Sequence, residues 1–232
     1  MVYNCTLFNL LFGYAPLCPA CSQVTDKPRH FCPACRNSLA TISNPCKKCG
    51  LPIPQGSHCG RCLTHPPPFE ALISACVYQF PLSPIIQQFK FSARLYFAYP
   101  LSQLLADRLL QDSGRTWPEC IIPVPLHNAR QRQRGFNQAV ELARPVAKRL
   151  NIALDHGSCT RHKHTRQQAS LKRSQRQANL HKAFSLRRAI SYRHVAIIDD
   201  VVTTANTVAA MAEMLRSHGV ETVEIWCIAR AL

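Results

Sequence analysis

Two adjacent carboxylates and the polar turn behind them are the residues of this sequence with the most evident chemistry. Asp199 and Asp200 directly follow an apolar run, residues 195–198, which is typical of a buried parallel strand. An amphipathic helix follows the turn, and Gly219 is placed to terminate it. The residues of the turn are Thr203, Thr204, Ala205, Asn206 and Thr207.

This arrangement predicts a site for a ribose phosphate. The turn would lie at a helix N-terminus, where unpaired backbone N–H groups and the positive end of the helix dipole favour a phosphate. Its hydroxyl and amide side chains can donate further hydrogen bonds, and Asp199 and Asp200 can accept hydrogen bonds from sugar hydroxyls. A plain helix cap is the alternative, but a cap requires only one such side chain.

Four Cys-x-x-Cys pairs predict two structural zinc sites. A gap of two residues lets both sulfurs of a pair face one ion, and two pairs complete a tetrahedral site with no open position. We expect the first pair to join the second and the third to join the fourth, although spacing alone leaves an interleaved arrangement open. Disulfides are disfavoured because no apolar signal-peptide segment opens the chain. The eight ligands are Cys18, Cys21, Cys32, Cys35, Cys46, Cys49, Cys59 and Cys62.

Composition limits the class of protein and its partners. The 232 residues carry a formal net charge of +16, which implies attraction to nucleic acid or to phosphorylated metabolites. No long apolar stretch predicts a membrane span, and 13 cysteines without an export signal predict a reducing cytoplasm. We expect a double zinc ribbon over residues 1–65 and an α/β domain over residues 66–232, with the prolines at 66–68 as a stiff junction.

Strands alternate with helices after the prolines. This alternation predicts a mostly parallel sheet, whose ligands bind beyond the carboxyl ends of the strands. Pro145 lies inside an expected helix and predicts a kink or a restart there. The expected strands cover residues 71–80, 120–125, 195–198 and 222–230, and the expected helices lie around residues 83–91, 101–109, 140–150 and 208–218.

The segment from Asp199 to Thr207 resembles the phosphoribosyl-pyrophosphate (PRPP) signature of type I phosphoribosyltransferases. The resemblance implies that the two acids hold the 2′ and 3′ hydroxyls of the ribose and that the turn wraps the 5′-phosphate. Ala205 departs from the signature, which normally carries glycine there. A Cβ at a position of positive φ costs about 1 kcal/mol and can crowd the phosphate.

A second polar segment, residues 125–138, follows an expected strand and contains several arginines, whose paired N–H donors chelate phosphate oxygens. In phosphoribosyltransferases the loop at this topological position holds the pyrophosphate, so the resemblance assigns Arg134 and Gly135 there. The alternative is the exposed, basic start of a helix, with Asn137 as its N-cap.

A third polar segment resembles the mobile loop that closes over PRPP in amidophosphoribosyltransferases of the glutamine type. It contains Thr165, Gln168, Arg176 and Asn179, at spacings comparable with those of that lid. The alternative is a disordered basic linker, because the segment has almost no apolar residues.

Taken together, the chain resembles the ComF family along nearly its whole length. The residues that carry the resemblance are the eight paired cysteines and the segments 89–92, 134–138 and 199–204. Its nearest look-alikes in that family are the GntX-type proteins of Gram-negative bacteria, associated with the use of external DNA as a nutrient. Other members serve natural transformation by helping imported single-stranded DNA reach the cytoplasm.

The resemblance implies two alternative functions. In the first, the protein transfers a phosphoribosyl group, Mg²⁺ bridges the ribose and the pyrophosphate, and Asp199, Asp200 and Arg134 act on the reacting sugar. Lys90 is then a candidate for the phosphate and acceptor side of the pocket, and the acceptor is open. In the second, the protein keeps the fold without catalysis and binds single-stranded DNA. Either function allows DNA-uptake proteins as partners.

Overall fold

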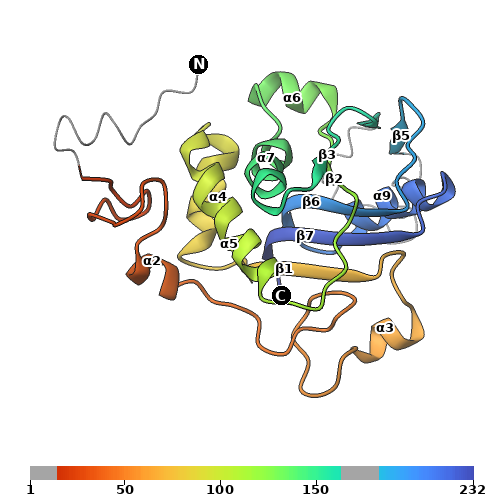
Figure 1. The fold of residues 1–232 in the computed structure, drawn as a ribbon, viewed down its shortest axis with the longest axis horizontal. Coiled ribbons are helices and arrows are strands. Elements are labelled where there is room, and N and C mark those ends of the chain that lie inside the picture. The colour runs from red at the N-terminus through yellow and green to blue at the C-terminus, as the bar shows by residue number, and fades with distance from the viewer. Residues whose placement is uncertain (1–14, 163–182) are drawn as a thin grey trace, which may run out of the picture.

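A five-stranded parallel sheet forms the centre of the molecule (Figure 1). The computed structural model describes residues 15–162 and 183–232. The strand order is β1-β7-β6-β2-β3, so the last strand of the sequence lies inside the sheet and β1 forms an edge, as expected. The strands are β1 (Ala71–Val77), β2 (Cys120–Pro123), β3 (Ala153–Leu154), β6 (His194–Val202) and β7 (Thr222–Arg230).

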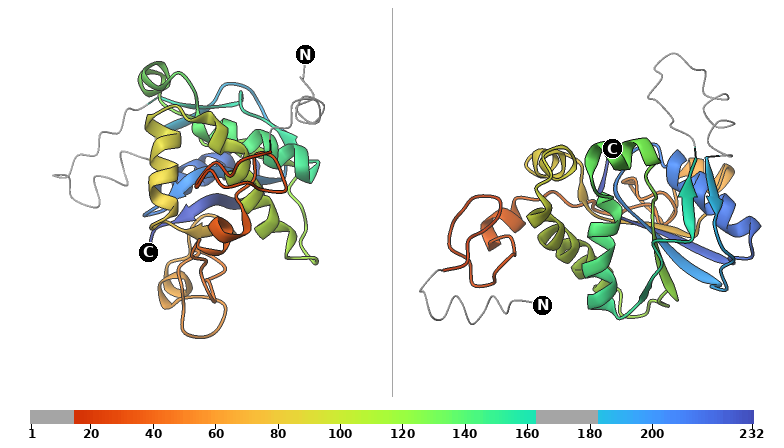
Figure 2. Two further views of the ribbon diagram at one scale, coloured as in Figure 1. Left: turned by 90° about the vertical axis from the view of Figure 1, so that its left-hand side faces the viewer. Right: turned by 90° about the horizontal axis from the view of Figure 1, so that it is seen from above.

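Helices cover both faces of this sheet, because alternate side chains of each strand point to opposite faces. In β6, Ala196 and Ile198 pack with α4, α5 and α7, whereas Val195 and Ile197 pack with α9. Figure 2 shows these helices on the two sides of the strands. Their bounds are α4 (Leu82–Phe91), α5 (Ala98–Leu110), α7 (Gln138–Leu150) and α9 (Asn206–Ser217).

The expected elements are present with small differences. Strand β7 has the bounds expected from its apolar run, and α9 is followed by Gly219 at a φ of 95°. Strand β6 is longer than expected and includes Asp199 and Asp200, whose backbones are held by pairing with β7. Helix α7 runs through Pro145 without a restart.

Several elements were not among those expected from the sequence. The polar segment after β2 forms the short helix α6 (Asn128–Arg134), and Leu95–Phe97 forms one turn of 3-10 helix. Strands β4 (Cys159–Arg161) and β5 (Phe184–Leu186) pair antiparallel and form a separate two-stranded sheet. Helix α6 lacks an apolar face, and the β4–β5 pairing joins residues far apart in the sequence, so neither produces a local pattern.

The cysteine-rich residues lie against the α/β domain in two places (Figures 1 and 2). The first ribbon contains α2 (Pro33–Asn37), and its buried Phe31 and Leu39 share a hydrophobic cluster with Leu101 of α5. The second ribbon contains α3 (Gly60–Thr64) and contacts β1 through the backbone hydrogen bond from Leu72 N to Lys47 O, 3.2 Å long. Both ribbons therefore pack directly on the domain.

Candidate functional site

The two acids lie at the carboxyl end of β6, where the parallel sheet opens to its ligand-binding edge. Asp200 is 3% exposed, and its Oδ2 lies 2.7 Å from Lys90 Nζ on α4. The Oδ1 atom of each acid accepts a hydrogen bond from the next backbone N–H, at 2.9 Å for Asp199 and 2.8 Å for Asp200. The structure therefore brings Lys90 to the acid pair.

The environment moves the pKa values of Asp199 and Lys90 toward pH 7. Burial raises the pKa of Asp199 to about 6, and the charges of Lys90, Arg161 and Arg134 oppose that rise. Burial also lowers the pKa of Lys90 to about 8, against the effect of Asp199. Titratable groups with such shifts gather at functional sites more often than elsewhere.

The turn after β6 has the conformation expected of a phosphate loop. Ala205 has a φ of 61° and a ψ of 1°, in the left-handed region that favours glycine. Ala205 is also the N-cap residue of α9, so no side chain at that position caps the helix. The first N–H groups of α9 are therefore open to a ligand. Thr203 and Thr204 are exposed, and Asn206 and Thr207 are half-buried.

Arg134 and Gly135 end helix α6 beside the acid pair. Gly135 is the C-cap with a φ of 81°, and the space around its Cα is open. Arg134 donates from Nη1 to Gln138 Oε1 at 2.5 Å, and its guanidinium lies 5.2 Å from the ring centre of the exposed Phe91. Asn137 caps α7 by accepting from Ala139 N at 2.9 Å, which confirms its expected role.

Arg161 belongs to the same site, and the sequence analysis did not assign it there. Its charge lowers the pKa of Asp199, as those of Lys90 and Arg134 do. The charge of Arg130 acts on Lys90, Arg134 and Arg161, which places all four cations in one neighbourhood. Four cations around two carboxylates leave an excess of positive charge, as an anionic ligand requires.

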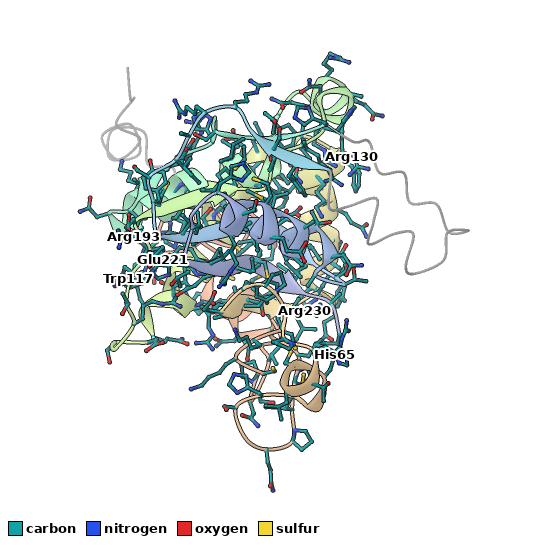
Figure 3. The ribbon with its side chains drawn as sticks, turned by 90° about the vertical axis from the view of Figure 1, so that its right-hand side faces the viewer. His65, Trp117, Arg130, Arg193, Glu221 and Arg230 are labelled. Atoms are coloured by element: carbon teal, nitrogen blue, oxygen red, sulfur yellow. The ribbon has the colours of Figure 1, made fainter. Side chains whose placement is uncertain are left out.

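The site lies at one end of the sheet. Figure 3 shows Arg130 and Arg230 on one side of the molecule, and Trp117, Arg193 and Glu221 on the other. Arg193 and Glu221 directly precede the first residues of β6 and β7, so they mark the amino edge of the sheet.

The eight paired cysteines form two separate four-sulfur clusters. Within each cluster the sulfurs lie within 4.8 Å of one another, and the Sγ atoms of Cys21 and Cys32, like those of Cys49 and Cys59, are 3.7 Å apart. Zn–S bonds of about 2.3 Å in a tetrahedron place two sulfurs about 3.8 Å apart, so the clusters fit zinc. The first pair joins the second and the third joins the fourth, as expected.

Backbone N–H groups donate hydrogen bonds to sulfurs of both clusters. Cys32 N donates to Cys18 Sγ, and Cys59 N donates to Cys46 Sγ, both at 3.3 Å. Burial raises the pKa of Cys18 and Cys46, but the combined backbone N–H donors outweigh it and lower each pKa to about 7. Each cluster thus favours the thiolate form at one cysteine, whereas burial and the neighbouring sulfurs raise the pKa of Cys35 and Cys62.

The expected lid cannot be compared with the structure, since Thr165, Gln168, Arg176 and Asn179 lie outside the described residues. Within residues 15–162 and 183–232, no helix has both the length and the apolar character needed to cross a membrane.

Comparison with known proteins agrees with both parts of the chain. Residues 7–63 match the model of the double zinc ribbon domain, and residues 137–232 match that of the phosphoribosyl transferase domain. The DNA utilization protein YhgH of Shigella flexneri is 39% identical over 228 residues, covering 96% of this chain and 94% of that protein. The chain belongs to the YhgH/ComF family.

Two other members of the YhgH/ComF family align over similar lengths. The DNA utilization protein YhgH of Escherichia coli K12 is 38% identical over 96% of this chain and 94% of that protein. Competence protein F of Haemophilus influenzae is 36% identical over 87% of this chain and 90% of that protein. The family assignment therefore rests on alignments that span both the ribbons and the α/β domain.

Proposed function

We propose that this protein binds PRPP, or another ribose 5-phosphate ligand, at the carboxyl edge of the sheet. The observation that carries the proposal is the excess of cations around Asp199 and Asp200, next to the open N-terminus of α9. A phosphorylated ribose suits this arrangement because it offers hydroxyls to the acids and anionic oxygens to the cations and the helix.

Each part of the ligand has a matching part of the site. Asp199 and Asp200 accept hydrogen bonds from the ribose hydroxyls, and Arg134, Gly135 and Lys90 face the pyrophosphate. Arg161 adds a further charge on that side. The 5′-phosphate binds the turn of Thr203, Thr204, Ala205, Asn206 and Thr207.

The oxygen atoms of this site and of the ligand suit Mg²⁺, which prefers carboxylate, phosphate and water oxygens. Asp199 and Asp200 would hold the ion together with oxygens of the ligand. Lys90 neutralises Asp200 at 2.7 Å, so the carboxylate has a partner when no ligand is bound.

Calorimetric titration with PRPP, with and without Mg²⁺, tests this proposal. We expect binding that weakens by more than about tenfold in Asp200→Asn, because the substitution removes a charge that faces the ribose and the ion. Glu221→Gln is the matched control, since Glu221 is exposed and lies at the amino edge of the sheet. Absence of PRPP binding by the wild-type protein, with Mg²⁺ present, would contradict the proposal. Release of pyrophosphate in the presence of candidate acceptors separates transfer from binding alone.

Single-stranded DNA is a second candidate ligand, and helix α6 is the observation that favours it. Its seven residues include Arg130 and Arg132, both exposed, and Arg134, and the relatives above carry names that refer to DNA utilization or competence. A terminal 5′-phosphate would enter the same turn, while the arginines contact the backbone. A cytoplasmic location and contacts with DNA-uptake proteins are part of the proposal for either function.

A salt titration tests this second function. Phosphate contacts release counterions, so the logarithm of the affinity falls linearly with the logarithm of the salt concentration. We expect PRPP to compete with a 5′-phosphorylated oligonucleotide and not with its 5′-hydroxyl counterpart. An affinity that does not change with salt would exclude this candidate.

A further inference from the structure

Arg230, the last residue of β7, connects the second ribbon with the phosphate turn. The residue is 4% exposed, and its Nε donates to Cys49 O at 3.0 Å. Its Nη1 donates to Val202 O at 3.0 Å, to Ala231 O at 2.7 Å, and to Thr203 O. Cys49 belongs to the second cysteine cluster, Val202 ends β6, and Thr203 begins the turn.

The charge of Arg230 has no carboxylate partner among the described ion pairs, and its hydrogen bonds go to carbonyl groups. A buried guanidinium without a counter-charge is costly. Four thiolates around one Zn²⁺ carry a net negative charge. Cys49 supplies both a thiolate to that cluster and a carbonyl to Arg230, so the loaded second centre lies next to the arginine.

Further contacts hold this part of the second ribbon against the sheet. Lys48 Nζ donates to Phe69 O at 3.0 Å, and Leu72 N donates to Lys47 O at 3.2 Å. Gly50, which directly follows Cys49, has a φ of 70°. A Cβ at this position would lie 2.6 Å from Leu72 Cδ2. A side chain at this position would therefore have to displace the Leu72 side chain.

The first centre has different neighbours. Its ribbon contacts α5 through the ion pair from Arg36 to Asp107, 2.5 Å long, and through the edge contact of His30 with Tyr99, whose ring centres are 5.4 Å apart. The segment after this ribbon also accepts a hydrogen bond at Ala40 O from Val77 N, the last residue of β1, at 2.8 Å. None of these partners belongs to the turn after β6 or to β7.

We propose that the second zinc centre, through Arg230, positions the turn that binds the phosphate, and that the first centre does not. Arg230 is a positioning residue in this scheme, since it touches the main chain of the turn rather than the ligand. The inference rests on the proposed function of that turn. Loss of zinc from the second centre removes the counter-charge and the fixed carbonyl, which frees Arg230 and the start of the turn.

Linkage makes this coupling reciprocal. If zinc in the second centre strengthens phosphate binding, then a bound phosphate ligand slows the loss of that zinc by the same coupling free energy. The first zinc should leave at the same rate with and without the ligand.

Hydrogen exchange of the unliganded protein tests the coupling without any assumption about the ligand. We expect the backbone amides of Ala209 and Ala231, which donate to Ala205 O and Val202 O, to exchange about tenfold faster in Arg230→Met and in Cys59→Ser than in the wild-type protein. Cys32→Ser is the matched control, because it opens the first centre, and it should change exchange at these residues by less than about twofold. Equal exchange in Cys59→Ser and Cys32→Ser, or no change in either, would overturn the proposal.

Brief chelation of the wild-type protein repeats the test where a substitution prevents folding. Alkylation of Cys59 or Cys32 reports which centre has opened, and exchange at Ala209 and Ala231 should follow the alkylation of Cys59. PRPP titration of the same samples separates the two proposals. If the protein does not bind PRPP, but exchange still changes only when the second centre opens, the proposed function is wrong and the coupling stands. If PRPP binds equally well whether the first or the second centre is opened, the coupling is wrong and the proposed function stands.

Discussion

The two zinc ribbons have the same set of ligands and nearly the same geometry, but they contact different parts of the α/β domain. In both, an Sγ pair 3.7 Å apart joins the two halves of the cluster, and a backbone N–H donates to a sulfur at 3.3 Å. The first ribbon rests on α5 and the end of β1, whereas the second reaches the start of β1, Arg230 of β7 and the turn after β6.

This difference shows that an identical metal module can serve different purposes through its neighbours. The apolar contacts of the first ribbon, which include Phe31 and Leu39, belong to the core of the domain. The contacts of the second ribbon are mainly hydrogen bonds with main-chain groups: those of Lys47 and Lys48 lie at the start of β1, and that of Cys49 joins Arg230 near the candidate site. The first ribbon therefore contributes to packing, and the second can influence the geometry of the site.

Metal removal should give the largest effect. We expect two zinc ions per chain by elemental analysis, and a loss of stability on chelation that reflects about 10 kcal/mol of apparent folding energy for a structural zinc. Thermal unfolding with and without chelator measures it. A zinc content near zero in reducing buffer would contradict the structural role of both ribbons.

The close approach of the second ribbon to β1 can be tested by adding a single methyl group. We expect Gly50→Ala to destabilise the protein by about 2–4 kcal/mol, because it combines strain at positive φ with a clash against Leu72. Gly56→Ala is the control, since Gly56 has a φ of 84° and open space around it, and it should cost about 1 kcal/mol. Equal losses in denaturant unfolding would show that the contact with Leu72 carries no energy.

A pH titration examines the acid pair of the candidate site. Burial raises the pKa of Asp199 from 3.8 to about 6, so the folded state disfavours its charged form. The stability of the wild-type protein relative to Asp199→Asn should therefore fall as the pH rises from about 4 to about 6, and remain constant above. Gly56→Ala should show the same profile as the wild-type protein. A relative stability that rises over this range would contradict the pKa shift.

Relief of strain in the turn should have a moderate effect. Ala205 has a φ of 61°, so Ala205→Gly removes about 1 kcal/mol of strain and the methyl group beside the phosphate. We expect PRPP to bind up to about tenfold more tightly, as measured by calorimetry. The gain should be smaller in an Arg230→Met background, where the start of the turn is no longer held. Weaker binding in Ala205→Gly would indicate that the methyl group contacts the ligand favourably.

The smallest effect is expected at the first ribbon. Arg36 and Asp107 form an ion pair whose arginine side chain is 47% exposed, and such pairs contribute less than about 1 kcal/mol. Arg36→Ala should leave PRPP affinity unchanged, and unfolding in denaturant should shift only slightly. A marked loss of affinity would mean that the first ribbon also influences the site.

Local patterns in the sequence predict much of this structure. The apolar runs of β6 and β7 predict the two central strands, and the polar run after β6 locates the turn, including the unusual backbone at Ala205. These features depend on neighbouring residues, so periodicity and turn chemistry are sufficient to find them.

Other features depend on contacts between distant residues. Arg161 reaches the site because β4 pairs with β5 across a long intervening segment. No local sequence pattern predicts that pairing. The pairing of the cysteine knuckles is likewise a tertiary property, since the spacing permits an interleaved arrangement. The sequence predicts only that Arg230 is the polar end of a strand. Its hydrogen bonds to Cys49 and Thr203 in the structure indicate that it also connects the second ribbon with the turn.

The contact between Cys49 and Arg230 also sets an order for assembly during synthesis. The two residues are 181 positions apart, and β1 pairs only with β7 in the described sheet. The second ribbon can bind its metal early, but it cannot reach its final position until the ribosome has released residue 230. The first ribbon finds Asp107 and Tyr99 much sooner. On a growing chain, therefore, one ribbon docks while translation continues, and the other is completed together with the last strand.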